Sequence, residues 1–93
     1  MKATWPATGP GQRTMNHIGM LRAAIQANEN HAATLNAHLD LLNEVYVRAR
    51  GDDARRKHIR NEMAYYTRAL AEVHYARDVL RRTLQQALAA GDE

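Results

Sequence analysis

The sequence has no cysteine, no phenylalanine and only two prolines among its 93 residues. Without cysteine the chain can form no disulfide, use no thiol nucleophile and build no zinc site from thiolates. No apolar run approaches the ~18 residues that a membrane-spanning helix needs, and residues 1–11 lack the apolar run of a signal peptide. We therefore expect a soluble protein of the reducing cytoplasm that has no membrane partner.

Signatures of catalysis and of metal binding are also lacking. The chain has no glycine-rich phosphate loop and no nucleophile–base spacing. Glu29 precedes His31 by two residues, and Glu72 precedes His74 by two, whereas di-iron bundles use a Glu-x-x-His spacing. We expect a protein that is not an enzyme, with no catalytic residue, no metal site and no cofactor.

The sequence does contain a helical repeat. From Thr14, a candidate N-cap, small and apolar residues recur at alternating spacings of three and four, which is typical of a helix with a coiled-coil-like seam. This first stripe consists of Ile18, Leu21, Ile25, Asn28, Ala32, Leu35, Leu39, Leu42, Tyr46 and Ala49. It stops before Gly51, which suits a left-handed C′ position, and before Asp52 and Asp53, either of which can cap a second helix.

A second stripe follows this break and predicts the fold. It consists of Ile59, Met63, Tyr66, Leu70, Val73, Arg77, Leu80, Leu84 and Ala87. We predict an all-α, antiparallel helical hairpin over residues 14–91, with helices at 14–50 and 54–90 and a turn at 51–53. Residues whose numbers sum to about 105 then face each other. Residues 1–13, which hold both prolines, are predicted to be a flexible tail, with docking of Trp5 as the alternative.

The apolar faces are wider than one hairpin requires. Further apolar residues flank the two stripes: Met20, Ala24, Ala27, Leu41, Val45, Tyr65, Ala69, Ala76, Val79 and Leu88. A monomer would leave this surface exposed, and exposed apolar patches of such size usually mark an interface. We predict a homo-oligomeric helical bundle, either a dimer or a larger assembly.

Four polar residues are expected to meet near the middle of the seam. The hairpin register places Asn28 opposite Arg77 and His31 opposite His74. An arginine, two imidazoles and an amide can together hold a phosphate or carboxylate, so these four are a candidate ligand-binding layer. The alternative is structural, because a polar seam residue commonly fixes helix register and subunit number.

A second candidate site surrounds the turn. Its six basic residues, called here the basic tip, are Arg48, Arg50, Arg55, Arg56, Lys57 and Arg60. The only acidic residues in the same stretch are Asp52 and Asp53, so the cluster has a net positive charge that attracts phosphates. Some of its charges also complement the dipole of the first helix. Arg68, Arg81 and Arg82 continue on or near the outer face of the second helix. Tyr75 is predicted outside the seam, where it can stack on a base.

The hairpin plan resembles that of small RNA-binding four-helix dimers encoded by plasmids. It also resembles small helical phage proteins that sequester cyclic nucleotide signals or block host complexes, and the run from Met63 to Leu70 is similar to helices of this second group. The likeness is architectural and transfers no site residue. We expect a binding protein that captures a nucleotide-type ligand or a nucleic acid through arginines, such as a phage-type sequestering protein. The alternative is an adaptor or inhibitor that docks a helix face on another protein.

Overall fold

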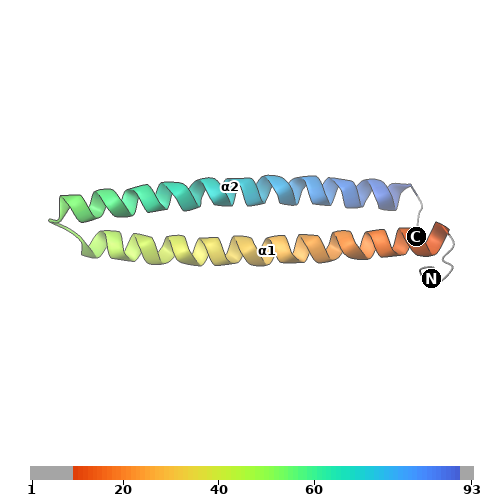
Figure 1. The fold of residues 1–93 in the computed structure, drawn as a ribbon, viewed down its shortest axis with the longest axis horizontal. Helices are drawn as coiled ribbons and strands as arrows, with labels where there is room; N and C mark the ends of the chain where they lie inside the picture. Colours follow the sequence, from red (N-terminus) through yellow and green to blue (C-terminus); the bar gives the residue numbers. More distant parts are fainter. Residues whose placement is uncertain (1–9, 91–93) are drawn as a thin grey trace, which may run out of the picture.

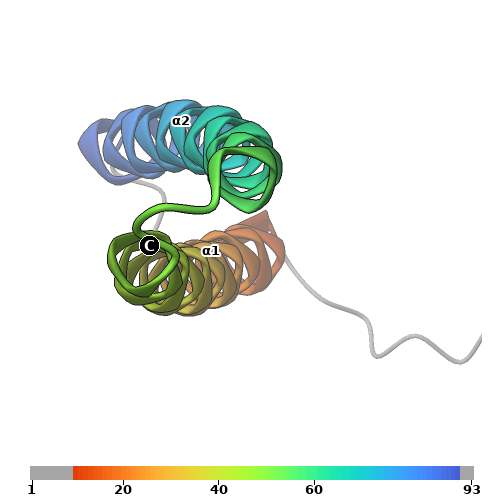
Figure 2. The same cartoon turned by 90° about the vertical axis from the view of Figure 1, so that its left-hand side faces the viewer.

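The chain folds into two antiparallel helices that lie side by side. In the computed structural model, which describes the backbone of residues 10–90 and the side chains of residues 16–90, these are α1 (Pro10–Arg48) and α2 (Asp53–Ala89) (Figures 1 and 2). The predicted all-α hairpin is therefore confirmed. Within the described residues neither helix is long and apolar enough to cross a membrane. Residues 1–9, including Trp5, lie outside the described part of the chain.

Helix α1 begins earlier than the sequence pattern predicts. It starts at Pro10, and Thr14 lies inside the helix instead of at its N-cap. A proline is well suited to the first helical position, because its fixed φ matches the helix and its missing N–H would have no intrahelical partner there. Residues 10–13 thus belong to α1 and not to the predicted tail. At its other end the helix stops at Arg48 instead of residue 50.

The connection has the turn chemistry that the sequence predicts. The N–H of Ala49 donates to the carbonyl oxygens of Val45 at 2.9 Å and Tyr46 at 3.2 Å. Gly51 has a φ of +91°, a conformation that residues with a Cβ rarely adopt. The Asp52 carboxylate accepts a hydrogen bond from the backbone N–H of Arg55 at 3.1 Å and so caps α2.

The hydrophobic core is a single thin seam. The buried apolar residues are Ile18, Leu21, Leu35, Ala49, Ile59 and Val73, all members of the two predicted stripes. Every other stripe residue is half-buried, and no described side chain is less than 2% exposed. Two helices can shield only one side of each other, so the hairpin by itself encloses few side chains completely.

Contacts across the seam support the predicted register. The rings of His38 and Tyr66 lie 4.2 Å apart between centroids, and Arg60 reaches the Tyr46 hydroxyl. The residue numbers in these two pairs sum to 104 and 106, close to the predicted value. The register therefore follows from where the turn lies and from the stripe spacing.

Candidate functional site

At the turn end, two arginines of α2 are held against one tyrosine of α1. The Cζ atoms of Arg56 and Arg60 lie 4.0 Å and 6.0 Å from the centroid of the Tyr46 ring. Nη1 of Arg60 also donates a hydrogen bond to the Tyr46 hydroxyl at 3.2 Å. A guanidinium over the face of an aromatic ring is attracted by the ring's quadrupole. These contacts fix two cations of the basic tip and tie the end of α1 to the first turns of α2.

The charges around Tyr46 alter its acidity. The hydrogen bond from Arg60 lowers the pKa of the Tyr46 phenol, and the positive charges of Arg56 and Arg60 act in the same direction. Desolvation and the negative charge of Asp53 oppose this effect and do not cancel it. The Nε atom of Arg56 is buried and has no hydrogen-bond partner within the described residues. The local field at this point is therefore positive and stabilises a negatively charged oxygen.

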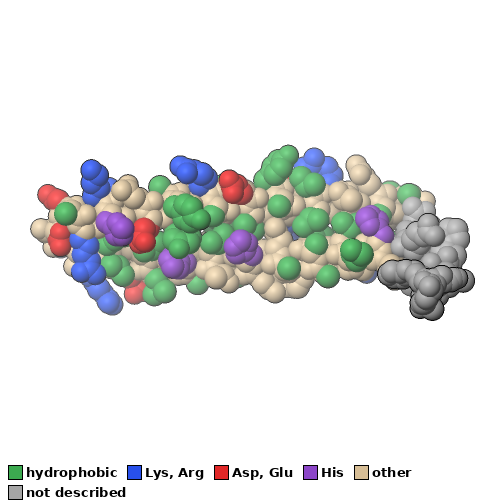
Figure 3. Space-filling view, viewed as in Figure 1, with side chains coloured by type: hydrophobic (Ala, Val, Ile, Leu, Met, Phe, Trp, Pro, Cys, Tyr) green, Lys and Arg blue, Asp and Glu red, His purple; other side chains and the backbone are tan. Residues whose placement is uncertain are grey.

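The other four members of the basic tip are exposed to solvent. Arg48 lies 3.9 Å from Glu44, but both side chains are largely exposed, and such a pair contributes little. Of the two nearby aspartates, Asp52 already accepts the capping hydrogen bond. Lysine and arginine side chains are visible at the turn end of the molecule in Figure 3. The six cations predicted around the turn thus surround one convex end of the rod.

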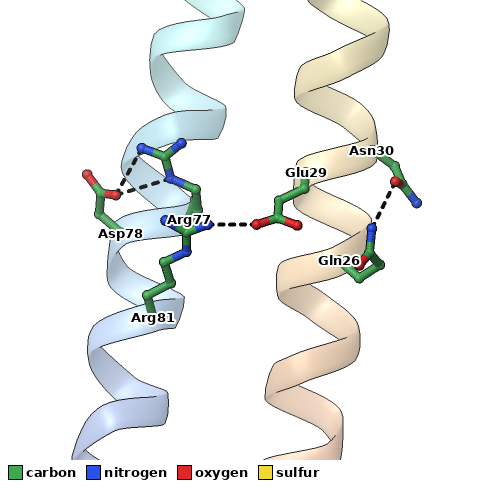
Figure 4. Close-up of polar contacts among 6 residues, drawn as sticks. All are labelled: Gln26, Glu29, Asn30, Arg77, Asp78 and Arg81. Atoms are coloured by element: carbon green, nitrogen blue, oxygen red, sulfur yellow. Dashed lines mark hydrogen bonds and ion pairs between the residues drawn. The ribbon is translucent and has the colours of Figure 1, made fainter.

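The four polar residues that are predicted to meet near the middle of the seam have different surroundings. Arg77 is half-buried, but its Nε and Nη2 atoms both donate to Oδ1 of Asp78, on its own helix, at 3.2 Å (Figure 4). The side-chain oxygen of Asn28 is buried and has no partner. His31 is exposed and His74 is half-buried. No hydrogen bond among the described side chains joins any two of these four residues.

Besides the hydrogen bond from Arg60 to Tyr46, a second polar link crosses the seam, and it was not predicted. Nη2 of Arg81 lies 2.6 Å from Oε2 of Glu29, so α2 is connected to α1 by an ion pair (Figure 4). The sequence pattern predicts Arg81 on or near the outer face of α2. The sequence does contain a signal for this ion pair. Glu29 directly follows the seam residue Asn28, and Arg81 directly follows the seam residue Leu80. Both residues therefore flank the seam on the same side, within reach of each other.

Aromatic residues outside the tip divide into two groups. Tyr66 lies in the seam, stacks with His38 and contacts the ring of Tyr65 edge-on at 5.1 Å. Tyr75 is 72% exposed, as the sequence pattern predicts for a residue outside the seam. Its ring has no stacking partner among the described residues, so its suggested role in base stacking remains a prediction.

No group of three or more His, Asp or Glu residues in the described part of the chain is arranged to hold a metal ion. Comparisons of the chain with protein families, with curated proteins and with solved structures each found no match. The function is therefore inferred from the chain's own geometry. Its two chemically distinctive features are the basic tip and the exposed apolar side chains along the rod.

Proposed function

We propose that this chain is a non-enzymatic, homo-oligomeric binding protein of the cytoplasm that captures a nucleic acid through its basic tip. The arrangement at Tyr46 carries this proposal. Arg56 and Arg60 are held in place by one aromatic ring, and four more cations surround the same turn. A partner with several phosphates can contact the two arginines at Tyr46 and the solvent-exposed cations together.

The shape of the tip favours a polyanion over a single small ligand. Its cations lie around the turn between the two helices, and five of the six are exposed. A string of backbone phosphates can follow such a surface, and each contact releases condensed counterions. Arginine also offers phosphate a planar set of donors. Because Arg56 and Arg60 are already ordered, binding loses less side-chain entropy at these positions.

The seam layer is the weaker of the two predicted sites. The Arg77 guanidinium, which was expected to bind the ligand, already donates twice to Asp78. The His31 side chain is exposed, whereas Asn28 is half-buried. We assign these residues a structural role, in which a polar position in the seam restricts the register and the number of subunits.

One observation favours the second class of function, an adaptor or inhibitor that docks a helix face on another protein. Several large apolar side chains are more than half exposed: Met20, Leu41, Val47, Tyr65 and Tyr75. Side chains of this kind are typical of protein interfaces. If they bind a foreign protein, neutralising the tip should leave that binding intact.

Neutralising the free cations of the tip tests nucleic-acid binding. The variant carries Arg50→Gln, Arg55→Gln and Lys57→Gln, which spares the contacts at Tyr46. We expect its affinity for a fluorescent mixed-sequence oligonucleotide to fall at least about tenfold. The slope of log K against log salt should become shallower by about 2 to 3, because each lost phosphate contact removes ~0.7–0.9 of the slope. Fluorescence anisotropy at several salt concentrations measures both quantities.

A matched control variant distinguishes the effect of the tip charges on oligonucleotide affinity from the effect of the protein's net charge. The variant Arg22→Gln, Arg68→Gln and Arg82→Gln loses the same net charge at three exposed positions away from the tip. It should keep most of the affinity and most of the salt slope. Equal losses in the two variants would show only general attraction to a basic protein, and no loss in the tip variant would remove the proposed site.

A further inference from the structure

The hairpin has two broad faces with different chemistry. The contact between His38 and Tyr66 lies on one side of the seam. The ion pair between Glu29 and Arg81 lies on the other side. The helical repeat assigns further residues to each side. The first side, called here the apolar face, carries Met20, Ala24, Ala27, Leu41, Val45, Tyr65, Ala69, Ala76 and Val79. The opposite side, called the charged face, carries the charged residues Arg22, Glu29, Asp40, Asp78 and Arg81.

Large side chains on the apolar face are strongly exposed. Met20 is 71% exposed, Tyr65 is 63% exposed and Leu41 is 60% exposed. They are distributed along both helices, so the exposed apolar surface runs along most of the rod. On the opposite face the large exposed apolar residues among the described side chains are Val47 and Leu88, and these lie near the two ends of the hairpin.

The apolar face is also poor in formal charge. Away from the turn it has no lysine or arginine among residues 16–90, whose side chains are described, and its polar members include His17, His31, His38, Glu62 and Glu72. Glu62 lies 3.8 Å from His58. Figure 3 shows a broad face on which hydrophobic and histidine side chains lie along the junction of the helices, whereas lysine and arginine lie at the turn end and along the outer edge of α2. Little charge would have to be desolvated to cover such a surface.

We propose that a second copy of this chain covers the apolar face with its own apolar face, so that two hairpins form a four-helix bundle. This inference rests on the self-association included in the proposed function and names the surface that mediates it. The available area is sufficient. A strip ~50 Å long and ~20 Å wide across two helices offers about 1,000 Å², compared with the ~800 Å² per partner of a typical stable interface.

Charge selects the relative orientation of the two copies. If both turns lay at the same end, the two basic tips would be adjacent and would repel each other. If the turns lie at opposite ends, the tips are separated by ~55 Å, the length of a 37-residue helix, which far exceeds the ~8–10 Å range of electrostatic interactions at physiological salt. We therefore infer a two-fold dimer with its turns at opposite ends, in which each tip remains free to bind phosphate.

Substitutions on the two faces test the interface. The first variant carries Leu41→Glu and Tyr65→Glu on the apolar face. The control carries Val47→Glu and Ala71→Glu, which add the same charge at exposed positions on the charged face. Light scattering should show a dimer for the wild type and for the control, and a monomer for the apolar-face variant. If the monomer unfolds, as judged by circular dichroism, the milder pair Leu41→Ser and Tyr65→Ser should weaken the dimer by about tenfold or more.

The possible outcomes distinguish the separate claims. A dimer that survives the apolar-face changes and dissociates with the control changes would overturn this inference while leaving self-association intact. A monomeric wild type at micromolar concentration would overturn both, and the face would then be available to a foreign protein. Neither result bears on the oligonucleotide binding of the tip, which the neutralisation experiment measures separately.

Spin labels test the orientation. The chain has no native cysteine, so Ala54→Cys introduces one attachment point at the exposed start of α2. Opposite turns predict a label separation of about 50 Å or more in the dimer, on the basis of helix length. Adjacent turns predict about half that distance or less, and this result would overturn the proposed orientation. A label at Ala71→Cys, midway along α2, should give similar distances in both arrangements.

Discussion

At the scale of single residues, Tyr46 links the two helices at the turn. Its ring lies beneath Arg56, and its hydroxyl accepts a hydrogen bond from Arg60. The residue belongs to the first apolar stripe, where its spacing predicts packing alone. The contact with two arginines arises because the chain reverses direction a few residues later and brings the first turns of α2 over the ring.

The lowered pKa of Tyr46 predicts a specific dependence of stability on pH. Above the folded-state pKa the native phenol has lost its proton, whereas the unfolded chain keeps it until the ordinary value, about 10, is reached. The contribution of Tyr46 to the unfolding free energy therefore rises with pH between the folded-state pKa and the unfolded-state pKa. It is lost again as the pH falls through the folded-state pKa. The difference in unfolding free energy between the wild type and Tyr46→Phe should therefore grow between about pH 8 and about pH 10.5.

Urea unfolding of both proteins at the two pH values measures this difference. The variant Arg60→Gln is the control, because it removes the largest cause of the shift and leaves the phenol in place. A difference that stays constant with pH, or that persists undiminished in the Arg60→Gln background, would contradict the assigned cause.

Asn28 is the second residue whose environment predicts a measurable effect. Its side-chain oxygen is buried without a hydrogen-bond partner, and such a group typically costs about 1–3 kcal/mol. We expect Asn28→Leu to stabilise the protein by about 1–2 kcal/mol in urea unfolding. The exposed Asn36→Leu should change stability by less than about 0.5 kcal/mol. A loss of stability in Asn28→Leu would show that this amide has a partner in the folded assembly.

At the scale of elements, two glycines illustrate how the chain separates helix from turn. Gly51 has a φ of +91°, and Gly19 lies within α1. An added Cβ would meet no atom within 4 Å at either position. Steric contact with neighbours is therefore excluded in both cases, and only the backbone conformation differs.

Replacing each glycine by alanine should have opposite effects. Gly51→Ala places a Cβ in the left-handed region and should reduce the unfolding free energy by about 1–2 kcal/mol. Gly19→Ala removes a flexible residue from a helix interior and should increase it by about 0.5–1 kcal/mol. Thermal or urea unfolding measures both changes. A Gly51→Ala variant that loses no stability would mean that the turn does not require the left-handed conformation.

The ends of the elements were predicted less well than their interiors. Helix α1 begins at Pro10 because a proline at the first helical position is as effective a start as the threonine cap that the pattern suggested. By contrast, the start of α2 followed the aspartate cap and the glycine, two signals that lie next to each other. A boundary is predictable where several local signals coincide, and it is ambiguous where they compete.

At the scale of the whole molecule, the distribution of side chains divides the hairpin into a basic end, a charged face and an apolar face. The proposed bundle uses these regions without conflict, because covering the apolar face leaves both basic tips in solvent. The thin seam gives a physical reason for self-association. A hairpin with no side chain less than 2% exposed among its described residues gains stability when a second layer covers its exposed apolar groups.

The sequence by itself determined the helical hairpin, the residues of the seam, the position of the turn and the clustering of cations around it. These features depend on local spacing and on residues close together in the chain, which the helical period and the turn signals specify directly.

Only the tertiary structure decided which polar side chains meet across the seam. The register set Asn28 against Arg77, yet Arg77 is bonded to Asp78, and Arg81 reaches Glu29 instead. Long side chains choose among several partners within reach, and that choice depends on small differences in distance and desolvation that the repeat does not encode. The contacts of Tyr46 with Arg56 and Arg60 likewise depend on the tertiary structure, because they form only when α2 packs against α1.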